Sequence, residues 1–141
     1  MKDNKLKLGK TLKQMNSIGL VMPRVLATVG VNFSKQAFAK QGWADKGFSK
    51  WQKRKGNAKR NQGRSILVDS GDLRRSIRIL STGIGRATYG SRLVYAPVHN
   101  AGLRAGRGRG FKMPKRQFIG QSQRLQRKMN TILAIRYLKA F

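Results

Sequence analysis

The chain has 141 residues, 39% of them hydrophobic, and its thirty-two Lys and Arg stand against four Asp and no Glu, a formal charge of +28. This length and apolar content support one folded domain with a core and argue against wholesale disorder. The lack of cysteine excludes disulfides, cysteine-based zinc sites and thiol nucleophiles. So many like charges oppose compaction, so we expect a polyanion or an acidic protein surface to compensate them.

The first forty residues predict two helices. A short one is expected from about Lys10 to Ile18, and a firmer one begins near Pro23, whose missing N–H is tolerated in a first helical turn. The second helix carries apolar residues at helical spacing from Val25 to Phe38, which is typical of core packing. Gly42 is placed to end it.

The same region bears on the compartment. Its apolar run from Ile18 to Val31 is interrupted by Pro23 and Arg24, so it predicts neither a membrane span nor a cleavable signal. We therefore expect a cytoplasmic protein without a membrane partner.

Residues 44–64 form a basic segment with eight Lys or Arg, three Gly and two aromatics, Phe48 and Trp51. Its lack of period predicts a loop. One interpretation is a nucleic-acid contact, with an aromatic ring stacking on bases and cations neutralising phosphates; the other is a solvated linker pinned to the core by its aromatics. Within 46–64, the candidate contacts to DNA or an acidic partner are Lys50, Trp51, Lys53, Arg54, Lys55, Lys59, Arg60 and Arg64.

The next block predicts regular structure. Ser70 as N-cap and Asp72 in the first turn indicate a short helix over about 71–75. Alternation over 76–81, a Ser-Thr-Gly turn and a second strand-like run over 84–91 indicate a β-hairpin.

A second basic segment follows a turn or short helix around Pro97. Residues 101–116 contain four Gly and six Lys or Arg and predict a flexible loop. The run Arg107–Phe111 resembles an arginine–glycine box that binds RNA, although a single copy favours a plain solvated loop. The candidate contacts here are Arg104, Arg107, Arg109, Lys112, Lys115 and Arg116.

A last helix is indicated by Ser122 as N-cap and by apolar residues at helical spacing from Leu125 to Phe141.

Residues that could carry catalysis are scarce. His99 is the only histidine, and a Ser-His-Asp set assembled from Ser70, His99 and Asp69 lacks the sequence context of a nucleophile. We therefore expect no enzyme, no cofactor and no bound metal, and a structural imidazole at His99 whose nitrogens bond to nearby backbone.

Three motifs in series resemble the virion morphogenesis family of tailed phages, which includes tail-completion proteins. They are ILVDSGDLRRSI (66–77), YGSRLVYAPVHNAG (89–102) and MPKRQFIG (113–120), and the resemblance covers about residues 20–140. Where the family usually has Gln-Phe-Gly after the histidine, this chain has Asn100-Ala101-Gly102. The matching positions are Ser70, Gly71, Leu73, Ser76, Ile77, Tyr95, Ala96, His99, Gly102, Met113, Pro114, Arg116, Phe118, Ile119 and Gly120.

The resemblance implies a single α+β domain over 1–141, with a long N-terminal helix, a small antiparallel sheet and a C-terminal helix packed on the sheet. It implies structural roles for the motif residues: turns at the glycines, and core positions for Leu73, Ile77, Tyr95, Phe118 and Ile119. It also implies a non-enzymatic role in tail completion or head–tail joining, in a homo-oligomeric ring at the neck or tail end of the virion, after assembly in the host cytoplasm.

The expected partners are other neck or tail proteins. Because the charge of +28 is unusual for the group, DNA is a further candidate partner of the 46–64 and 101–116 segments. The alternative function is a general DNA- or RNA-binding basic protein, ribosomal or nucleoid-like.

Overall fold

The computed structural model describes residues 2–55 and 62–139. The elements in chain order are α1 (Lys2–Lys40), β1 (Gly42–Ala44), β2 (Phe48–Lys50), α2 (Asp72–Ser76), β3 (Arg78–Gly83), β4 (Arg86–Gly90), α3 (Ala96–Ala101), β5 (Arg104–Ala105), β6 (Phe111–Lys112) and α4 (Gln123–Leu138). The strands pair as three separate antiparallel hairpins, β1–β2, β3–β4 and β5–β6. The expected α+β class, with a long N-terminal helix, antiparallel strands and a C-terminal helix, is confirmed. The strands form three hairpins in place of the one small sheet that was expected, and α4 packs on α1.

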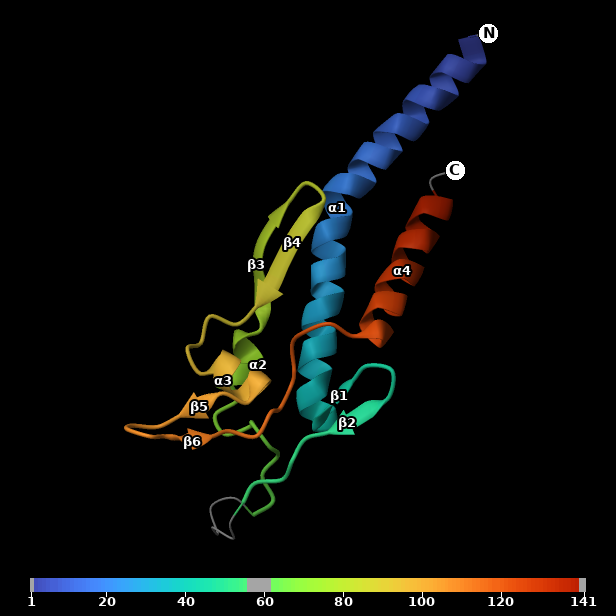
Figure 1. Cartoon of the computed structure of the whole chain (residues 1–141). Helices are drawn as coiled ribbons and strands as arrows, with labels where there is room; N and C mark the ends of the chain where they lie inside the picture. Colours follow the sequence, from blue (N-terminus) through green and yellow to red (C-terminus); the bar gives the residue numbers. More distant parts are fainter. Residues whose placement is uncertain (1, 56–61, 140–141) are drawn as a thin grey trace.

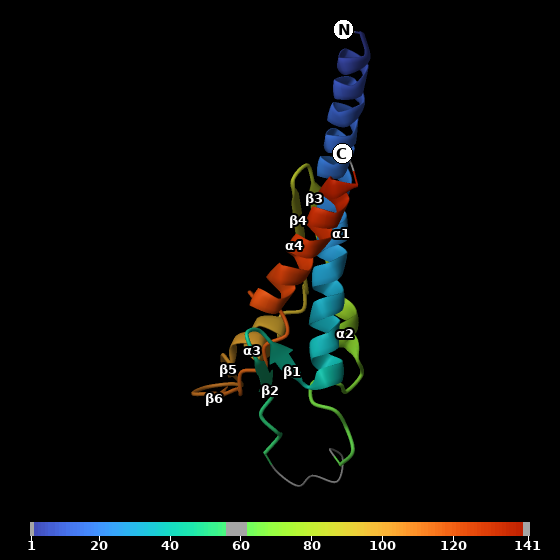
Figure 2. The same cartoon turned by 90° about the vertical axis from the view of Figure 1, so that its right-hand side faces the viewer.

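α1 is one continuous helix, so the prediction of two helices is wrong. Pro23 lies in its interior, and Met22 and Ala27 beside it are buried. Tertiary packing of such a face, more than local propensity, keeps a helix formed. Figure 1 shows α1 bending near the tip of the β3–β4 hairpin, as proline in a helix interior causes. Its N-terminal part extends beyond every other element in both views (Figures 1 and 2).

The continuity of α1 also changes the membrane argument. Among the described residues, the segment Gly9–Lys40 is long and apolar enough to cross a membrane, with a mean hydropathy of 1.3 over its most apolar window. The interruption expected at Pro23 and Arg24 therefore does not occur in the helix. Of that window, 33% is buried inside the protein, and one such helix near the N-terminus is by itself weak evidence for a membrane span.

α1 ends at Lys40, and Gln41 holds its end. The prediction that Gly42 ends the helix is therefore wrong. Gln41 adopts the left-handed conformation, with φ 56°. Its side-chain amide donates to the Ile66 carbonyl at 3.2 Å and accepts the Ile66 N–H, so the helix end is tied to a distant loop. Gly42 serves the hairpin, because a Cβ there would lie 2.6 Å from the Ser49 carbonyl oxygen of β2.

α4 begins on the first hairpin and then follows α1, which it flanks on the side away from the β3–β4 hairpin (Figure 1). Ser122 caps α4 as predicted, since its Oγ accepts the N–H of Leu125 at 3.1 Å. The same hydroxyl donates to the Ala44 carbonyl at 2.7 Å, and the Asp45 carboxylate accepts the N–H of Gln123 at 2.7 Å. The cap therefore also docks the helix.

The core lies along the C-terminal half of α1. Phe38 is 1% exposed and packs edge-on against Trp51, with 5.4 Å between ring centroids, and at a tilt against Phe118, at 5.1 Å. Leu73, in the first turn of α2, and Ile77, the C-cap of that helix, are also buried there. Segments from four parts of the chain thus share one apolar cluster.

Two predicted turns are shifted by one or two residues. α2 is capped by Gly71 at φ 80°, without a side-chain cap bond, and the Ser70 hydroxyl accepts the Asp72 N–H at only 3.4 Å. The second hairpin is confirmed, but it turns at Ile84-Gly85 and not at the Ser-Thr-Gly run. Gly85, at φ 67°, supplies the left-handed backbone that this turn needs.

The two basic segments were expected to be loops, but the first contains β2, which pairs with β1 at the start of the segment, and the second contains the β5–β6 hairpin. Gly42 pairs with Lys50 between β1 and β2, and Arg104 pairs with Lys112 between β5 and β6. Backbone pairing satisfies the amide groups without an apolar period in the sequence, which explains why the pattern did not reveal the strands. Of the turn or short helix expected around Pro97, the structure has the helix, α3.

Candidate functional site

A groove of about 1000 Å³ opens between α2, α3, the segment after β2 and the segment after β6. Ser70 and Gly71, Tyr95 and His99, and Pro114 and Arg116 all line it. The three sequence motifs therefore converge on one site. Lys55 and Lys112 line it as well, so the fold also brings the two basic segments together there.

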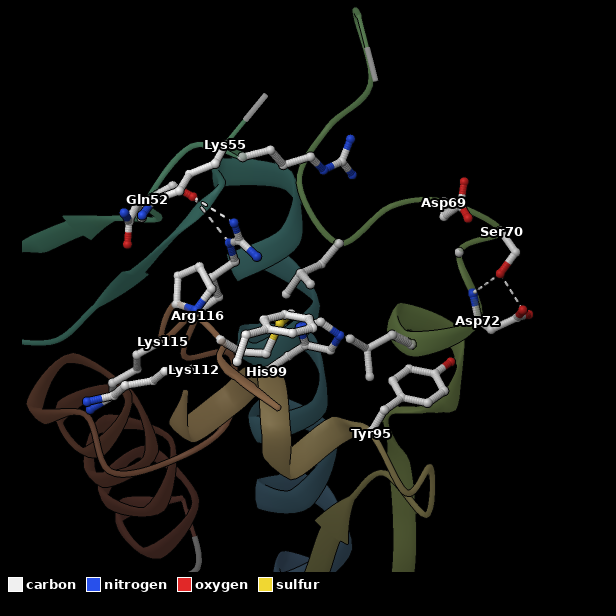
Figure 3. Close-up of a pocket in the computed structure, with 17 residues that line it drawn as sticks. Gln52, Lys55, Asp69, Ser70, Asp72, Tyr95, His99, Lys112, Lys115 and Arg116 are labelled. Atoms are coloured by element: carbon white, nitrogen blue, oxygen red, sulfur yellow. Dashed lines mark hydrogen bonds between the residues drawn. The ribbon is translucent and has the colours of Figure 1, made fainter. Parts of the chain in front are cut away.

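The groove has two walls of opposite charge (Figure 3). Asp69, Ser70 and Asp72 lie on one side, Lys112 and Lys115 on the other, and the His99 ring lies between them. Hydrogen bonds from Ser70 and then Arg75 hold the pKa of Asp72 below its usual value, and the carboxylate of Asp69 accepts a 2.8 Å ion-pair bond from Arg64. Both carboxylates are thus engaged by groups of their own chain.

Arg116 supplies a buried positive charge to the groove. Its side chain is 5% exposed, and its Nε and Nη2 donate to the Gln52 carbonyl at 3.2 and 3.1 Å. Burial, and then the nearby charge of Arg54, lower the pKa of this guanidinium. Among the described residues no carboxylate lies within ion-pair distance of it. A buried charge is costly when it has no counter-charge.

His99 sits beside Arg116 with a polar atom unsatisfied. Its Nδ1 is covered by protein and has no hydrogen-bond partner within the described part of the chain. Burial, and then Arg116, lower the pKa of this imidazole. The expectation that the ring nitrogens bond to backbone is wrong for Nδ1, because the backbone of His99 makes the bond instead: its carbonyl accepts the Arg116 N–H at 2.9 Å.

Asn100 holds the third motif in place, a role that the sequence did not indicate. Its Oδ1 accepts the N–H groups of Phe118 and Ile119, both at 2.9 Å, and its Nδ2 donates to the Ile119 carbonyl at 3.0 Å. A side-chain amide can satisfy an irregular segment in this way because it both donates and accepts. The available signal was an amide residue at the end of a short helix, two positions before a capping glycine.

The motif glycines serve turns as expected, but one assigned core residue does not. Gly71, Gly102 and Gly120 have φ of 80°, 72° and 149°. Tyr95 is 43% exposed, so its assignment to the core is wrong. Its ring instead faces the groove, edge-on to the His99 ring with 6.1 Å between centroids.

The candidate contact residues are divided by the structure into exposed and buried sets. Trp51 is 4% exposed and its Nε1 donates to the Gln117 carbonyl at 2.9 Å, so it has no free face to stack on a base. Arg116 is buried and Arg54 is half-buried; Lys59 and Arg60 lie outside the described residues. The exposed members are Lys50, Lys53, Lys55, Arg64, Arg104, Arg107, Arg109, Lys112 and Lys115.

The groove does not bring Ser70, His99 and Asp69 together as a catalytic triad. The Ser70 hydroxyl bonds to Asp72, and Figure 3 shows the His99 ring apart from it. A nucleophile–base pair needs a bond between the two side chains. Among the residues described, no group of three potential metal-ligating side chains occurs.

The groove and its motifs agree with the comparison with known families. A model of the phage virion morphogenesis family matches residues 3–139. The chain belongs to this family, and the resemblance carried by the three motifs is confirmed. The comparisons with curated proteins and with solved structures gave no match. Membership supports a role in phage virion assembly.

Proposed function

We propose that the protein acts in tail completion or head–tail joining, as a non-enzymatic subunit at the neck or tail end of the virion. Family membership over residues 3–139 carries this proposal. The groove supports it, because its motif residues build a binding surface without a bonded nucleophile and base. The proposed state is a homo-oligomeric ring assembled in the host cytoplasm, with virion proteins as partners and no membrane.

The charge supports close contact with anions. Four Asp can neutralise only a small part of thirty-two cations, and a ring of such subunits would concentrate the repulsion. An acidic neighbouring protein or the end of the packaged DNA would offset it. The exposed cations of the two basic segments are the proposed contacts.

Deletion of the gene from its phage, followed by complementation, tests the proposal. We expect heads and tails that stay unjoined, seen by electron microscopy, and restoration of particles by the wild-type chain. A variant with Lys53, Arg107, Arg109 and Lys112 changed to Gln should restore fewer particles. The matched control changes Lys10, Lys13, Arg127 and Arg136 to Gln, four exposed cations away from the groove, and should restore them. Normal particles from the deletion would refute the proposal.

A general nucleic-acid-binding protein is the second candidate, favoured by the net charge. Such a protein should bind unrelated DNA with an affinity that falls steeply with salt, and its deletion should leave particles joined. Undetectable DNA binding at low salt would eliminate it.

A further inference from the structure

The groove holds a charge that the described part of the chain does not neutralise. The Arg116 guanidinium has five N–H donors, and the Gln52 carbonyl takes only two groups, Nε and Nη2. The neighbouring His99 Nδ1 has no hydrogen-bond partner among the residues that the structure describes. Buried polar groups without partners are uncommon and need an explanation. An anion entering the groove would supply the missing counter-charge.

The rest of the groove fits a polypeptide better than a nucleic acid. Tyr95 and Phe111 are 43% and 60% exposed at its rim, and Leu73 and Met113 add apolar surface. The carboxylates of Asp69 and Asp72 stand on the wall opposite the lysines (Figure 3), so the groove suits a single carboxylate beside Arg116 better than a continuous run of phosphates. Apolar walls with a few placed charges are typical of sites that take a side chain with its neighbours.

We propose that this groove binds an extended segment of a partner protein and seats one aspartate or glutamate side chain of that segment against Arg116. Apolar residues beside the acid would pack on Tyr95 and Phe111. Lys112 and Lys115 would steer the acidic segment towards the groove. This inference rests on the proposed function only for the kind of partner, an acidic virion protein.

A second copy of the chain is a poor source of the acid. It has four side-chain carboxylates. Among the side chains that the structure describes, those of Asp69 and Asp72 are engaged by Arg64 and Arg75, and that of Asp45 accepts the N–H of Gln123. The side chain of Asp3 lies outside the described part, so the Asp3→Asn variant tests self-binding through it.

His99, the only histidine, gives a direct reporter for the experiment. The full chain is titrated with a capped hexapeptide that has one central glutamate flanked by leucines, and the ring nitrogen and carbon resonances of His99 are followed by NMR. The competitors are the same peptide with glutamine for glutamate, inorganic phosphate and a short single-stranded DNA. Titrations are made at about 0.5 M salt, where the screening length falls to roughly 4 Å and diffuse attraction to the net charge is weak.

Two uncharged changes separate the groove from the general charge. Met113→Trp should fill the groove, and Met15→Trp is the matched control on an exposed position of α1. We expect saturable His99 shifts with the glutamate peptide and binding of the glutamine peptide weaker by about 30-fold or more, as for removing one partner of a buried charge pair. Met113→Trp should abolish the shifts, and Met15→Trp should leave them intact, with folding of both checked by circular dichroism.

Several results would overturn the assignment. Equal binding of the two peptides, or shifts that persist in Met113→Trp, would show that the acid does not sit in the groove. If the DNA or phosphate competed with the peptide at equal charge, the groove would be a phosphate site. If the His99 shifts depended on protein concentration and vanished in Asp3→Asn, the groove would bind a second copy of the chain. If particle assembly needs the gene but the peptide does not bind, only the proposed ligand of the groove is refuted. If the peptide binds but particle assembly does not need the gene, only the proposed function is refuted.

Discussion

The backbone carbonyl of Gly19 in α1 accepts a hydrogen bond from the backbone N–H of Gly85, at the tip of the β3–β4 hairpin, with 3.4 Å between the two atoms. In an uninterrupted helix this carbonyl would accept from the residue four positions later. That residue is Pro23, which has no N–H to give. The hairpin therefore takes up the acceptor that the proline leaves open, at the place where α1 bends (Figure 1).

Replacing Pro23 by Ala should transfer this acceptor back to the helix. We expect the Gly85 amide to exchange with deuterium faster, because its acceptor is then used by residue 23. We also expect the free energy of unfolding to rise by about 1–3 kcal/mol, since proline is the least favourable residue in a helix interior. Hydrogen exchange and denaturant unfolding measure the two effects. Unchanged protection of Gly85 together with lower stability would mean that the bend itself is what the packing requires.

Gly102→Ala should destabilise the join between the second and third motifs. Gly102 has φ 72°, and a Cβ there would lie 2.8 Å from the backbone nitrogen of Lys115. We expect a loss of about 2–4 kcal/mol from the left-handed backbone and the overpacking together. Gly83→Ala is the control, because nothing lies within 4 Å of its Cβ and its backbone is not left-handed. If the two substitutions lowered the melting temperature equally, the left-handed backbone and close packing at Gly102 would not be the cause.

Trp51 should matter for stability and not for binding DNA. Trp51→Ala is expected to cost about 3–5 kcal/mol, as for other buried aromatic side chains. Trp51→Phe keeps most of the packing but leaves the Gln117 carbonyl without its donor, which costs about 1–3 kcal/mol. Phe48→Ala, at a 49% exposed position, serves as the control with a small effect. A folded Trp51→Phe protein with much weaker DNA binding would contradict the buried role.

His99 should make the protein less stable in mild acid. Burial, and then Arg116, place its folded-state pKa below the ordinary value of 6.5, so the unfolded chain binds the proton more readily. The stability associated with a neutral His99 is therefore complete above about pH 6.5 and is lost as the pH falls from there through the folded-state pKa. Asp72, whose pKa is lowered from 3.8, titrates below this window.

The measurement is the melting temperature between pH 8 and pH 5 at constant salt, for the wild type and His99→Gln. We expect the wild type to lose more stability than the variant over this range. Parallel curves would show that the imidazole has the same proton affinity in the folded and the unfolded chain.

Local signals in the sequence were enough for several elements. Ser122 predicted the start of the last helix because a serine cap acts on an N–H only three residues away. Pro97 predicted α3, and alternation predicted the β3–β4 hairpin. The three motifs indicated the family, because their order and spacing are properties of the chain itself. The composition alone also established the excess of cations.

Only the tertiary structure decided which of these residues work together. Trp51 is held by the carbonyl of Gln117, 66 residues away, and Arg116 by that of Gln52, 64 residues away. Burial turned both from expected surface contacts into internal groups. No window of sequence contains both ends of such a bond. A residue's exposure is set by the segments that pack over it, so the groove, the burial of Arg116 and the continuity of α1 through Pro23 emerge only once distant segments are brought into contact.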